Sequence, residues 1–418
     1  MNQPYDCIVI GGGPSGSTTA TLLADYGRRV LLLERSKFPR HHIGESLMPN
    51  TYYTFKRLGL LEKMKHSDFV VKESVQFVSP TGKESAPFFF PDRDPGEWSY
   101  TWQVERDRFD QMLLDNARAH GAEVIEQANV REAIFEGEQA VGVRATINGE
   151  SRAYHARIIV DATGQAGLLS RQLKMRYGDE KLKNAAIYAY YKGAQRDSGR
   201  NAGATLVVST PEPGGWFWFI PLANDVTSVG VVAPPNYLYN GRGDDPEVIL
   251  DEEIARCPGA SKRLSEAARV SKVYTTADYS YRSKRFAGHG WMLVGDAFGF
   301  LDPIYSSGVM LAFKSGEFAA DTIHEALTDG DVSAERLGRD GARLADGMQR
   351  IRQLVYAFYD PNFSMKGFVT EHPEYRDHIT RILIGDVFND DVAEVFEVMR
   401  HRINLPDAIR LEEAVPAP

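Results

Sequence analysis

The sequence predicts an α/β protein with a nucleotide-binding βαβ unit, an inserted antiparallel β-rich part and a helical C-terminal region. Three observations lead to this prediction. A glycine-rich turn lies between two short apolar runs near the N-terminus, and the middle of the chain is a succession of short strand-like segments between turns. The C-terminal part, about 90 residues, carries helical patterning. With 418 residues, the chain can bury a large core and hold two or three domains.

The glycine-rich turn predicts a phosphate cradle. An apolar run over residues 7–10 fits a buried parallel strand, and glycines with G-x-G-x-x-G spacing follow it. Gly11 permits a tight turn, Gly13 lets the backbone approach a pyrophosphate, and Gly16 lets helix and strand pack closely. The helix that Pro14 can begin offers free N–H groups and a positive dipole end to phosphates.

A second apolar run, residues 30–33, ends in Glu34. An acid about 20 residues beyond the glycines is expected to bind a ribose. Glycines also mark ordinary turns, but strand, glycine turn, helix, strand and acid together favour a dinucleotide-binding unit.

Composition excludes several other classes of protein. The net charge is −9, with 43% hydrophobic and 25% charged residues, as in an ordinary soluble enzyme. No basic patch is dense enough to predict nucleic acid binding, and no apolar run is long enough to predict a membrane span. Two cysteines make a disulfide framework unexpected, no Cys/His spacing predicts a metal site, and the N-terminus leaves no room for a signal peptide. We expect a cytoplasmic protein.

The remaining segments follow in order. We expect a loop at 35–50, a helix at 51–65, a hairpin at 75–78 and 87–90, a helix at 107–120 and a meander over 124–160. Antiparallel strands should fill 184–232, a buried strand 291–294 and a long helix 308–328. Helices are expected at 333–359 and 390–402, and a loose tail over 405–418.

These segments predict a discontinuous nucleotide domain with a second domain inserted twice. The nucleotide domain should comprise residues 1–70, 100–175 and 275–330. The β-rich substrate domain should comprise 71–99 and 176–274, and residues 331–418 should form a helical cap.

Four separated motifs resemble the flavin-dependent halogenases, within the larger superfamily of FAD monooxygenases. They are the glycine-rich turn with Glu34, a V-x-R-x-x-F-D segment around Arg106, Gly295-Asp296 after a buried strand, and W-x-W-x-I-P at 216–221. Alone, Arg106 would be a surface charge and Asp296 a helix cap. The resemblance implies a Rossmann-like FAD domain of the PHBH/glutathione-reductase type. It implies cofactor contacts from Gly11, Gly13, Ser15, Gly16, Glu34, Arg35, Glu45, Ser46, Arg106, Asp296, Pro303 and Gly308.

In the W-x-W-x-I-P motif, strand periodicity puts Trp216, Trp218 and Ile220 on one face. The resemblance implies that they form a wall that keeps the organic substrate away from the flavin. The plainer alternative is a buried aromatic core strand, because aromatic residues are favoured in strands.

Residues 302–308 resemble the halogenase D-P-x-x-S-x-G loop. There the matching Ser307 and Gly308 would bind halide through backbone N–H groups, and a helix N-terminus offers such donors. An ordinary N-cap at Ser306 or Ser307 is the compatible alternative.

Lys72 lies where these halogenases carry an essential lysine, although most lysines are solvated surface charges. The resemblance implies that it hydrogen-bonds hypohalous acid or is itself halogenated to a haloamine, and both remain open. Tyr305 occupies the place of a glutamate in tryptophan halogenases. It therefore argues against free tryptophan and for an electron-rich phenol or pyrrole, free or tethered to a carrier protein, with a catalytic role for Tyr305.

The expected activity is two-component halogenation. Reduced FAD from a separate reductase, with O2 and chloride or bromide, would generate hypohalous acid. No second nucleotide fingerprint predicts a bound NAD(P)H. The alternatives are an FAD-dependent aromatic monooxygenase, a reductase of the geranylgeranyl-reductase type, and a flavoprotein that has lost halogenation and serves as a binding partner.

Overall fold

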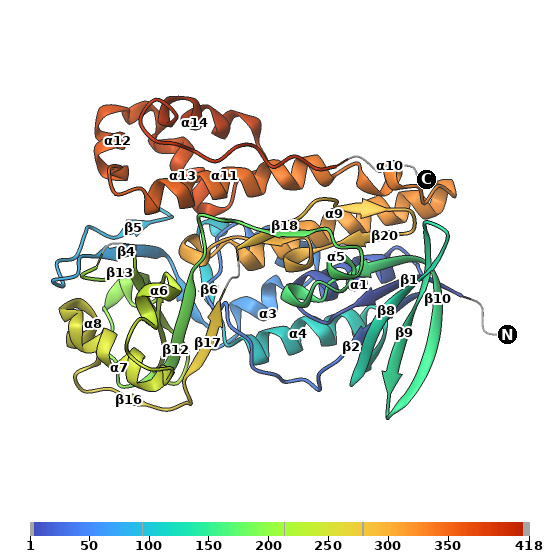
Figure 1. Cartoon of the computed structure of the whole chain (residues 1–418), viewed down its shortest axis with the longest axis horizontal. Helices are drawn as coiled ribbons and strands as arrows, with labels where there is room; N and C mark the ends of the chain where they lie inside the picture. Colours follow the sequence, from blue (N-terminus) through green and yellow to red (C-terminus); the bar gives the residue numbers. More distant parts are fainter. Residues whose placement is uncertain (1–3, 94, 213, 278–279, 413–418) are drawn as a thin grey trace.

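The computed structural model describes residues 4–93, 95–212, 214–277 and 280–412. Its first large sheet has the order β19-β20-β10-β1-β2-β7, with the neighbouring strands from β20 to β7 parallel. The strands are β1 (Tyr5–Ile10), β2 (Val30–Glu34), β7 (Glu123–Glu126), β10 (Glu150–Asp161), β19 (Ala287–Gly288) and β20 (Trp291–Leu293). The strands β8 (Ala128–Glu136) and β9 (Gln139–Ile147) continue from β10 as an antiparallel meander (Figure 1).

Helices α1 (Pro14–Asp25), α4 (Arg106–Ala119) and α9 (Gly308–Asp329) pack together beside this sheet. The approach of α1 and α9 is close because α9 carries Gly316 at the crossing. A Cβ on Gly316 would lie 2.7 Å from the backbone oxygen of Ser15. This packing brings the N-terminal ends of α1 and α9 to the same side of the structure.

The second large sheet has the order β16-β12-β15-β14-β13-β4-β5, with β17 also paired to β12. All its pairings are antiparallel except β13 with β4. The strands are β4 (Ser74–Val78), β5 (Phe88–Phe89), β12 (Ala185–Lys192), β13 (Thr205–Ser209), β14 (Trp216–Pro221), β15 (Val226–Ala233), β16 (Ala268–Arg269) and β17 (Tyr274–Ala277). Its outer face is covered by α7 (Pro246–Arg256) and α8 (Pro258–Leu264), two helices absent from the sequence prediction.

Two smaller sheets join the parts. β3 (Val70–Lys72) pairs with β6 (Thr101–Gln103), and β11 (Arg176–Gly178) pairs with β18 (Tyr281–Ser283), which pairs with β21 (Gly299–Phe300). Short helices α5 (Leu168–Gln172) and α6 (Pro235–Leu238) fill connections.

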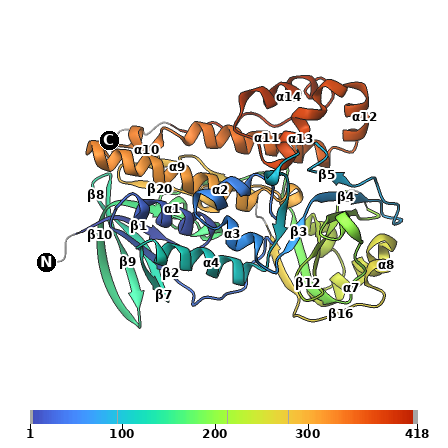
Figure 2. The same ribbon diagram turned by 180° about the vertical axis from the view of Figure 1, so that it is seen from behind.

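The C-terminal helices form a layer along one side of the molecule in both views (Figures 1 and 2). They are α10 (Ala334–Gly338), α11 (Gly341–Tyr359), α12 (Met365–Glu371), α13 (Arg376–Ile384) and α14 (Glu394–Met399). None of the helices in the described residues is long and apolar enough to cross a membrane.

Three sequence predictions need correction. The helix predicted over 333–359 is two helices, α10 and α11, because the first ends at Gly338 and a turn at residues 339–340 precedes the second. The helix predicted over 51–65 is two helices, α2 (Thr51–Arg57) and α3 (Leu61–Lys65), because Gly59 adopts a left-handed φ of +68° between them. The tail predicted to be loose is packed over residues 405–412: Leu405 and Ile409 are buried, and Gln349 donates to the Pro406 oxygen at 3.0 Å. Residues 413–418 lie outside the described part.

Candidate active site

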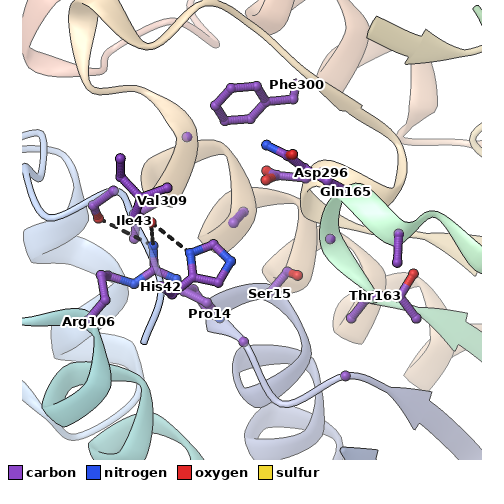
Figure 3. A pocket seen from close by; sticks show the side chains of 18 of the residues that line it. Pro14, Ser15, His42, Ile43, Arg106, Thr163, Gln165, Asp296, Phe300 and Val309 are labelled. Carbon is purple, nitrogen blue, oxygen red and sulfur yellow. Dashed lines mark hydrogen bonds between the residues drawn. The ribbon is translucent and has the colours of Figure 1, made fainter. Parts of the chain in front are cut away.

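A cavity of about 980 Å³ lies between the two large sheets and reaches the N-terminal ends of α1 and α9. Pro14, Ser15, Arg106 and Asp296 surround one part of it (Figure 3). Most of the residues singled out in the sequence line this cavity: Gly11, Gly13, Ser15, Glu34, Arg35, Glu45, Ser46, Arg106, Trp216, Trp218, Asp296, Pro303 and Gly308. Gly16, Lys72, Tyr305 and Ser307 do not line it.

The glycine-rich end of the cavity is made of backbone groups. Gly11 has a φ of +107°, and a Cβ there would lie 2.4 Å from the Ala162 oxygen. A Cβ on Gly16 would lie 2.0 Å from the oxygen of Gly11, so the helix can approach the turn this closely only because Gly16 has no side chain. At Gly13 the nearest protein atom would be 3.7 Å away, on Arg40. No side chain caps the first turn of α1, and its amides remain available to a ligand.

Glu34 holds the backbone of this end. Its carboxylate accepts from the backbone N–H of Gly12 at 2.8 Å and of Ser36 at 2.7 Å. The carboxylate oxygens keep further lone pairs, and Glu34 and Arg35 both line the cavity. The predicted ribose-binding acid therefore also braces the glycine turn.

Arg106 is buried and forms a bidentate ion pair with Asp110, at 2.8 Å and 3.0 Å. Its third nitrogen donates to the Ile43 oxygen at 2.7 Å, which fixes the loop that carries Glu45 and Ser46 (Figure 3). Burial alone would raise the pKa of Asp110, but the guanidinium of Arg106 and that of Arg40, 3.0 Å away, lower it below its usual value. Asp110 is the acid of the V-x-R-x-x-F-D segment, but the sequence analysis assigned a role only to Arg106 of that segment.

Two carboxyl groups line the cavity, that of Glu45 from the loop after β2 and that of Asp296 from the segment after β20. Burial raises the pKa of Asp296 to about 7, opposed by the charge of Arg106. Burial also raises the pKa of Glu45, although the Tyr190 hydroxyl donates to it at 2.7 Å.

The aromatic strand alternates as its period predicts. Trp216, Trp218 and Ile220 face the cavity, whereas Phe217 and Phe219 pack in the core beneath α7. Both indoles are tied by their N–H groups. The Trp218 Nε1 donates to the Ser228 Oγ at 3.0 Å, and the Trp216 Nε1 donates to the Tyr359 hydroxyl at 2.8 Å.

The Tyr359 hydroxyl, at the end of α11, connects the aromatic strand to the 302–308 loop. It donates to the Asp302 Oδ2 at 2.9 Å, and Asn184 donates to the same oxygen at 2.9 Å. Burial raises the pKa of Asp302 to about 6, against these two hydrogen bonds. Sequence reasoning missed Asn184 and Tyr359, because nothing local in the chain places them next to Asp302.

The 302–308 loop also makes a second, much smaller pocket of about 10 Å³, which Ser307, Gly308 and Asp296 line together with Phe300. This volume is about that of one water-sized particle. The Ser307 side chain does not cap α9, so the first amides of this helix of 22 residues keep their hydrogens free for an anion. Tyr305 points elsewhere: its hydroxyl lies 3.3 Å from the Leu354 oxygen of α11.

Lys72 is buried directly behind the cavity wall, with 2% of its surface exposed. Its Nζ donates to the Ser46 Oγ at 2.8 Å and to the Leu47 oxygen at 2.9 Å, and lies 5.6 Å from the Phe90 ring centre. Among the described residues no carboxylate pairs with it. Burial lowers the pKa of Lys72 to about 7. The surface-charge alternative is therefore wrong, since the amine is desolvated.

Comparison with known proteins decides the family. A family model described as tryptophan halogenase matches residues 6–91 and 81–366. The chain belongs to this family of flavin-dependent halogenases.

A 1H-pyrrole-2-carbonyl-peptidyl-carrier protein chlorinase of Pseudomonas fluorescens is 30% identical over 422 residues, which cover 96% of this chain and 94% of the chlorinase. The corresponding brominase of Pseudoalteromonas luteoviolacea is 33% identical over 410 residues, covering 96% and 97%. A solved flavin-dependent brominase superposes with a TM-score of 0.85 at 32% identity, covering 96% of this chain and 99% of the other. The chain is thus a halogenase that uses FAD and a halide, and this result favours halogenation over the three alternatives raised by the sequence.

The residues of the cavity fit FAD. A side chain at Gly11 or Gly16 would clash with backbone oxygen atoms of the turn. Gly13, in contrast, leaves open space beside the uncapped amides of α1. This combination suits a pyrophosphate.

Proposed function

We propose that this halogenase acts on an electron-rich pyrrole or phenol tethered to a peptidyl carrier protein, with Lys72 as an essential residue. The observation that carries the proposal is the buried amine of Lys72, hydrogen-bonded to Ser46 at the wall of a cavity that also contains a diphosphate cradle. The near full-length match to two enzymes named for pyrrolyl-carrier substrates supports the substrate class. Tyr305, in place of a glutamate, supports the same class.

For the cofactor, we propose that Gly11, Gly13, Ser15 and the start of α1 hold the diphosphate and that Glu34 and Arg35 hold the adenosine ribose. Glu45, Arg106, Asp296, Pro303 and Gly308 would face the flavin, Ser46 would lie at the edge of the flavin site where it also reaches the substrate side, and Gly16 would keep α1 in place. When bound in its reduced form, FAD supplies with O2 the oxidising power that turns halide into hypohalous acid. A separate flavin reductase is the proposed source of the reduced cofactor.

The amides of Ser307 and Gly308 are the proposed halide site. The free N–H groups at the start of α9 and the 10 Å³ pocket beside Asp296 support it, because a helix N-terminus favours a small anion. Trp216 and Trp218 would form the wall between flavin and substrate, and their tied indoles support a fixed barrier. The proposed organisation is a discontinuous nucleotide domain, a β-rich substrate domain and a helical cap.

Product mass tests the proposal. Purified protein would receive a flavin reductase, NADH, FAD, air and bromide, with pyrroles and phenols presented free and on a carrier protein. We expect a bromine isotope pattern on carrier-bound pyrrole, lost about 100-fold or more in Lys72→Ala, since removing a group that moves protons costs this much. Lys63→Ala, an exposed lysine of α3, is the matched control. A product that gains one oxygen without bromide would instead indicate a monooxygenase.

A further inference from the structure

Lys72 has access to the cavity only through a neighbouring hydroxyl. Its own atoms do not line the cavity, whereas those of Ser46 and Thr205 do. Ser46 Oγ lies 2.8 Å from the Lys72 Nζ and 2.8 Å from the Thr205 Oγ1. A reaction in the cavity therefore meets the Ser46 hydroxyl before it meets the lysine.

The direction of each hydrogen bond in this group can be assigned. The Gly203 carbonyl can only accept, and the Gln103 Nε2 lies 3.0 Å from it, so the amide nitrogen of Gln103 faces this way. The same nitrogen lies 2.8 Å from the Thr205 Oγ1, which must accept. The hydrogen of Thr205 is then left for the Ser46 Oγ.

With Lys72 charged, its ammonium donates to the Leu47 oxygen and to Ser46 Oγ. The serine oxygen then accepts from both Thr205 and Lys72, and both of its lone pairs are occupied. Its own hydrogen has no acceptor within this group and is directed into the cavity. With Lys72 neutral, the amine lone pair accepts that hydrogen instead. The charge on Lys72 therefore decides whether Ser46 donates into the cavity.

We propose that Ser46 is a catalytic proton relay that carries a proton from Lys72 to the oxygen of hypohalous acid, a role that rests on the proposed function of this cavity. As the aromatic carbon bonds to the halogen, the oxygen–halogen bond breaks and its electron pair stays on oxygen. That oxygen takes the Ser46 proton while Ser46 takes one from Lys72, and water leaves. The ring then loses its proton, which returns to Lys72 by the same route. Gln103 and Thr205 are positioning residues.

The relay sits on fixed backbone. Ser46 forms an isolated antiparallel β-bridge with Gln103, and the Val104 N–H donates to the Glu45 oxygen at 2.8 Å. Lys72 pairs with Thr101 across β3 and β6. No chain movement is needed for the transfer. Halogenation of the Lys72 Nζ itself would require the halogen to pass Ser46, which lies between Nζ and the cavity. The geometry therefore favours Lys72 as an acid over Lys72 as a haloamine.

Burial places the pKa of Lys72 at about 7, so the amine can lose and regain a proton near neutral pH. The charged groups of the neighbouring segments have hydrogen-bond or ion-pair partners other than Lys72. Glu45 accepts from Tyr190, and Arg106 is paired with Asp110. Thr205 of β13 contacts Ser46, and the apolar ring of Phe90 lies 5.6 Å from the Lys72 Nζ.

The test measures the ratio of brominated substrate to hypobromous acid caught by a diketone trap in solution, at saturating FAD. This ratio does not depend on how much cofactor is loaded. We expect Ser46→Ala to lower it about 100-fold at pH 6 and to abolish its pH dependence. Ser46→Thr, which keeps a hydroxyl, should restore most of the ratio. In the wild type the ratio should fall as pH rises through about 7, because the ammonium is the acid.

A wild-type ratio and pH profile in Ser46→Ala would overturn the relay, while loss of product in Lys72→Ala in the same series would leave the proposed function standing. A ratio that rises with pH through 7 would also overturn it and favour the haloamine. If Lys72→Ala itself kept the wild-type ratio, the proposed role of Lys72 and the relay would both be wrong. A folding defect alone would lower trapped hypobromous acid and product together. If Ser46→Ala gives lower totals at an unchanged ratio, the relay is also wrong.

Discussion

The two ends of the cavity are built in different ways. At the glycine end the ligand-facing groups are backbone amides, presented by one turn and one helix within a short stretch of chain. At the other end they are mainly side chains of Ser46, β13, β14 and the 302–308 loop, which Lys72 of β3 and Tyr359 of α11 hold from behind by hydrogen bonds. A site made of backbone fails when a side chain is added. A site made of side chains fails when a single polar atom is removed.

The largest expected effect is at Gly13. A methyl group there meets no protein atom closer than 3.7 Å, so Gly13→Ala should fold normally, yet the methyl occupies the space that the diphosphate needs. We expect the Kd for FAD to rise at least about 100-fold, or about 2.7 kcal/mol, by fluorescence titration. Gly16→Ala should lose both binding and thermal stability, because its methyl would lie 2.0 Å from a backbone oxygen.

Gly338→Ala is the control, since a methyl group there has no neighbour within 4 Å. Unchanged FAD affinity in Gly13→Ala would mean that the diphosphate does not lie against this turn.

Next in size is the pH dependence of stability that Lys72 imposes. Its pKa is about 7 in the folded protein against 10.5 for a free lysine, so the unfolded state binds more protons between these values. The contribution of Lys72 to the free energy of unfolding should therefore rise with pH, by up to about 1.4 kcal/mol per pH unit. Lys72→Met lacks this gain, and its stability relative to wild type should be greatest near pH 6 and fall by about 2.6 kcal/mol by pH 9.

Urea unfolding at pH 6, 7, 8 and 9 measures this, with Lys63→Met as the exposed control. A parallel pair of stability curves for wild type and Lys72→Met would show that Lys72 is not desolvated.

A smaller effect is expected at Tyr359. Tyr359→Phe removes the acceptor of the Trp216 indole N–H and a donor to Asp302, and the two buried groups lose a partner. We expect the fraction of NADH that ends in halogenated product to fall about 10-fold, with more peroxide released, as about 1.4 kcal/mol of positioning is lost. Tyr237→Phe is matched, because its hydroxyl also donates to a buried carboxylate, that of Glu253, far from the cavity. If both variants lowered the fraction of NADH that ends in halogenated product equally, Tyr359 would have no specific role in the active site.

The smallest effect should be at Tyr305. Its hydroxyl makes one long bond of 3.3 Å to the Leu354 oxygen and does not reach the cavity. We expect Tyr305→Phe to change kcat less than about twofold, within the range of a weak hydrogen bond. A 100-fold loss of kcat would restore the catalytic role that the resemblance implies.

The sequence predicted much of the fold where the signal is local. Strand, turn and helix of the βαβ unit lie where the glycines and apolar runs put them, and the alternation of the aromatic strand follows from its period of two. The break at Gly59 and the helices α7 and α8 were missed, although Asp245 before Pro246 is a helix-start signal and its side chain caps Glu247. The packed tail was missed because a short apolar stretch shows no partner in the sequence.

The sequence by itself determined which residues can turn tightly, which face of a strand is apolar and where a helix can begin, because each depends on neighbouring backbone and side chains. Only the tertiary structure decided that Lys72 is buried behind Ser46, that Arg106 braces a loop through Asp110, and that Tyr359 joins Trp216 to Asp302. These contacts link segments far apart in the chain. Desolvation and hydrogen-bond partners belong to the assembled neighbourhood of a group, and no local pattern carries them.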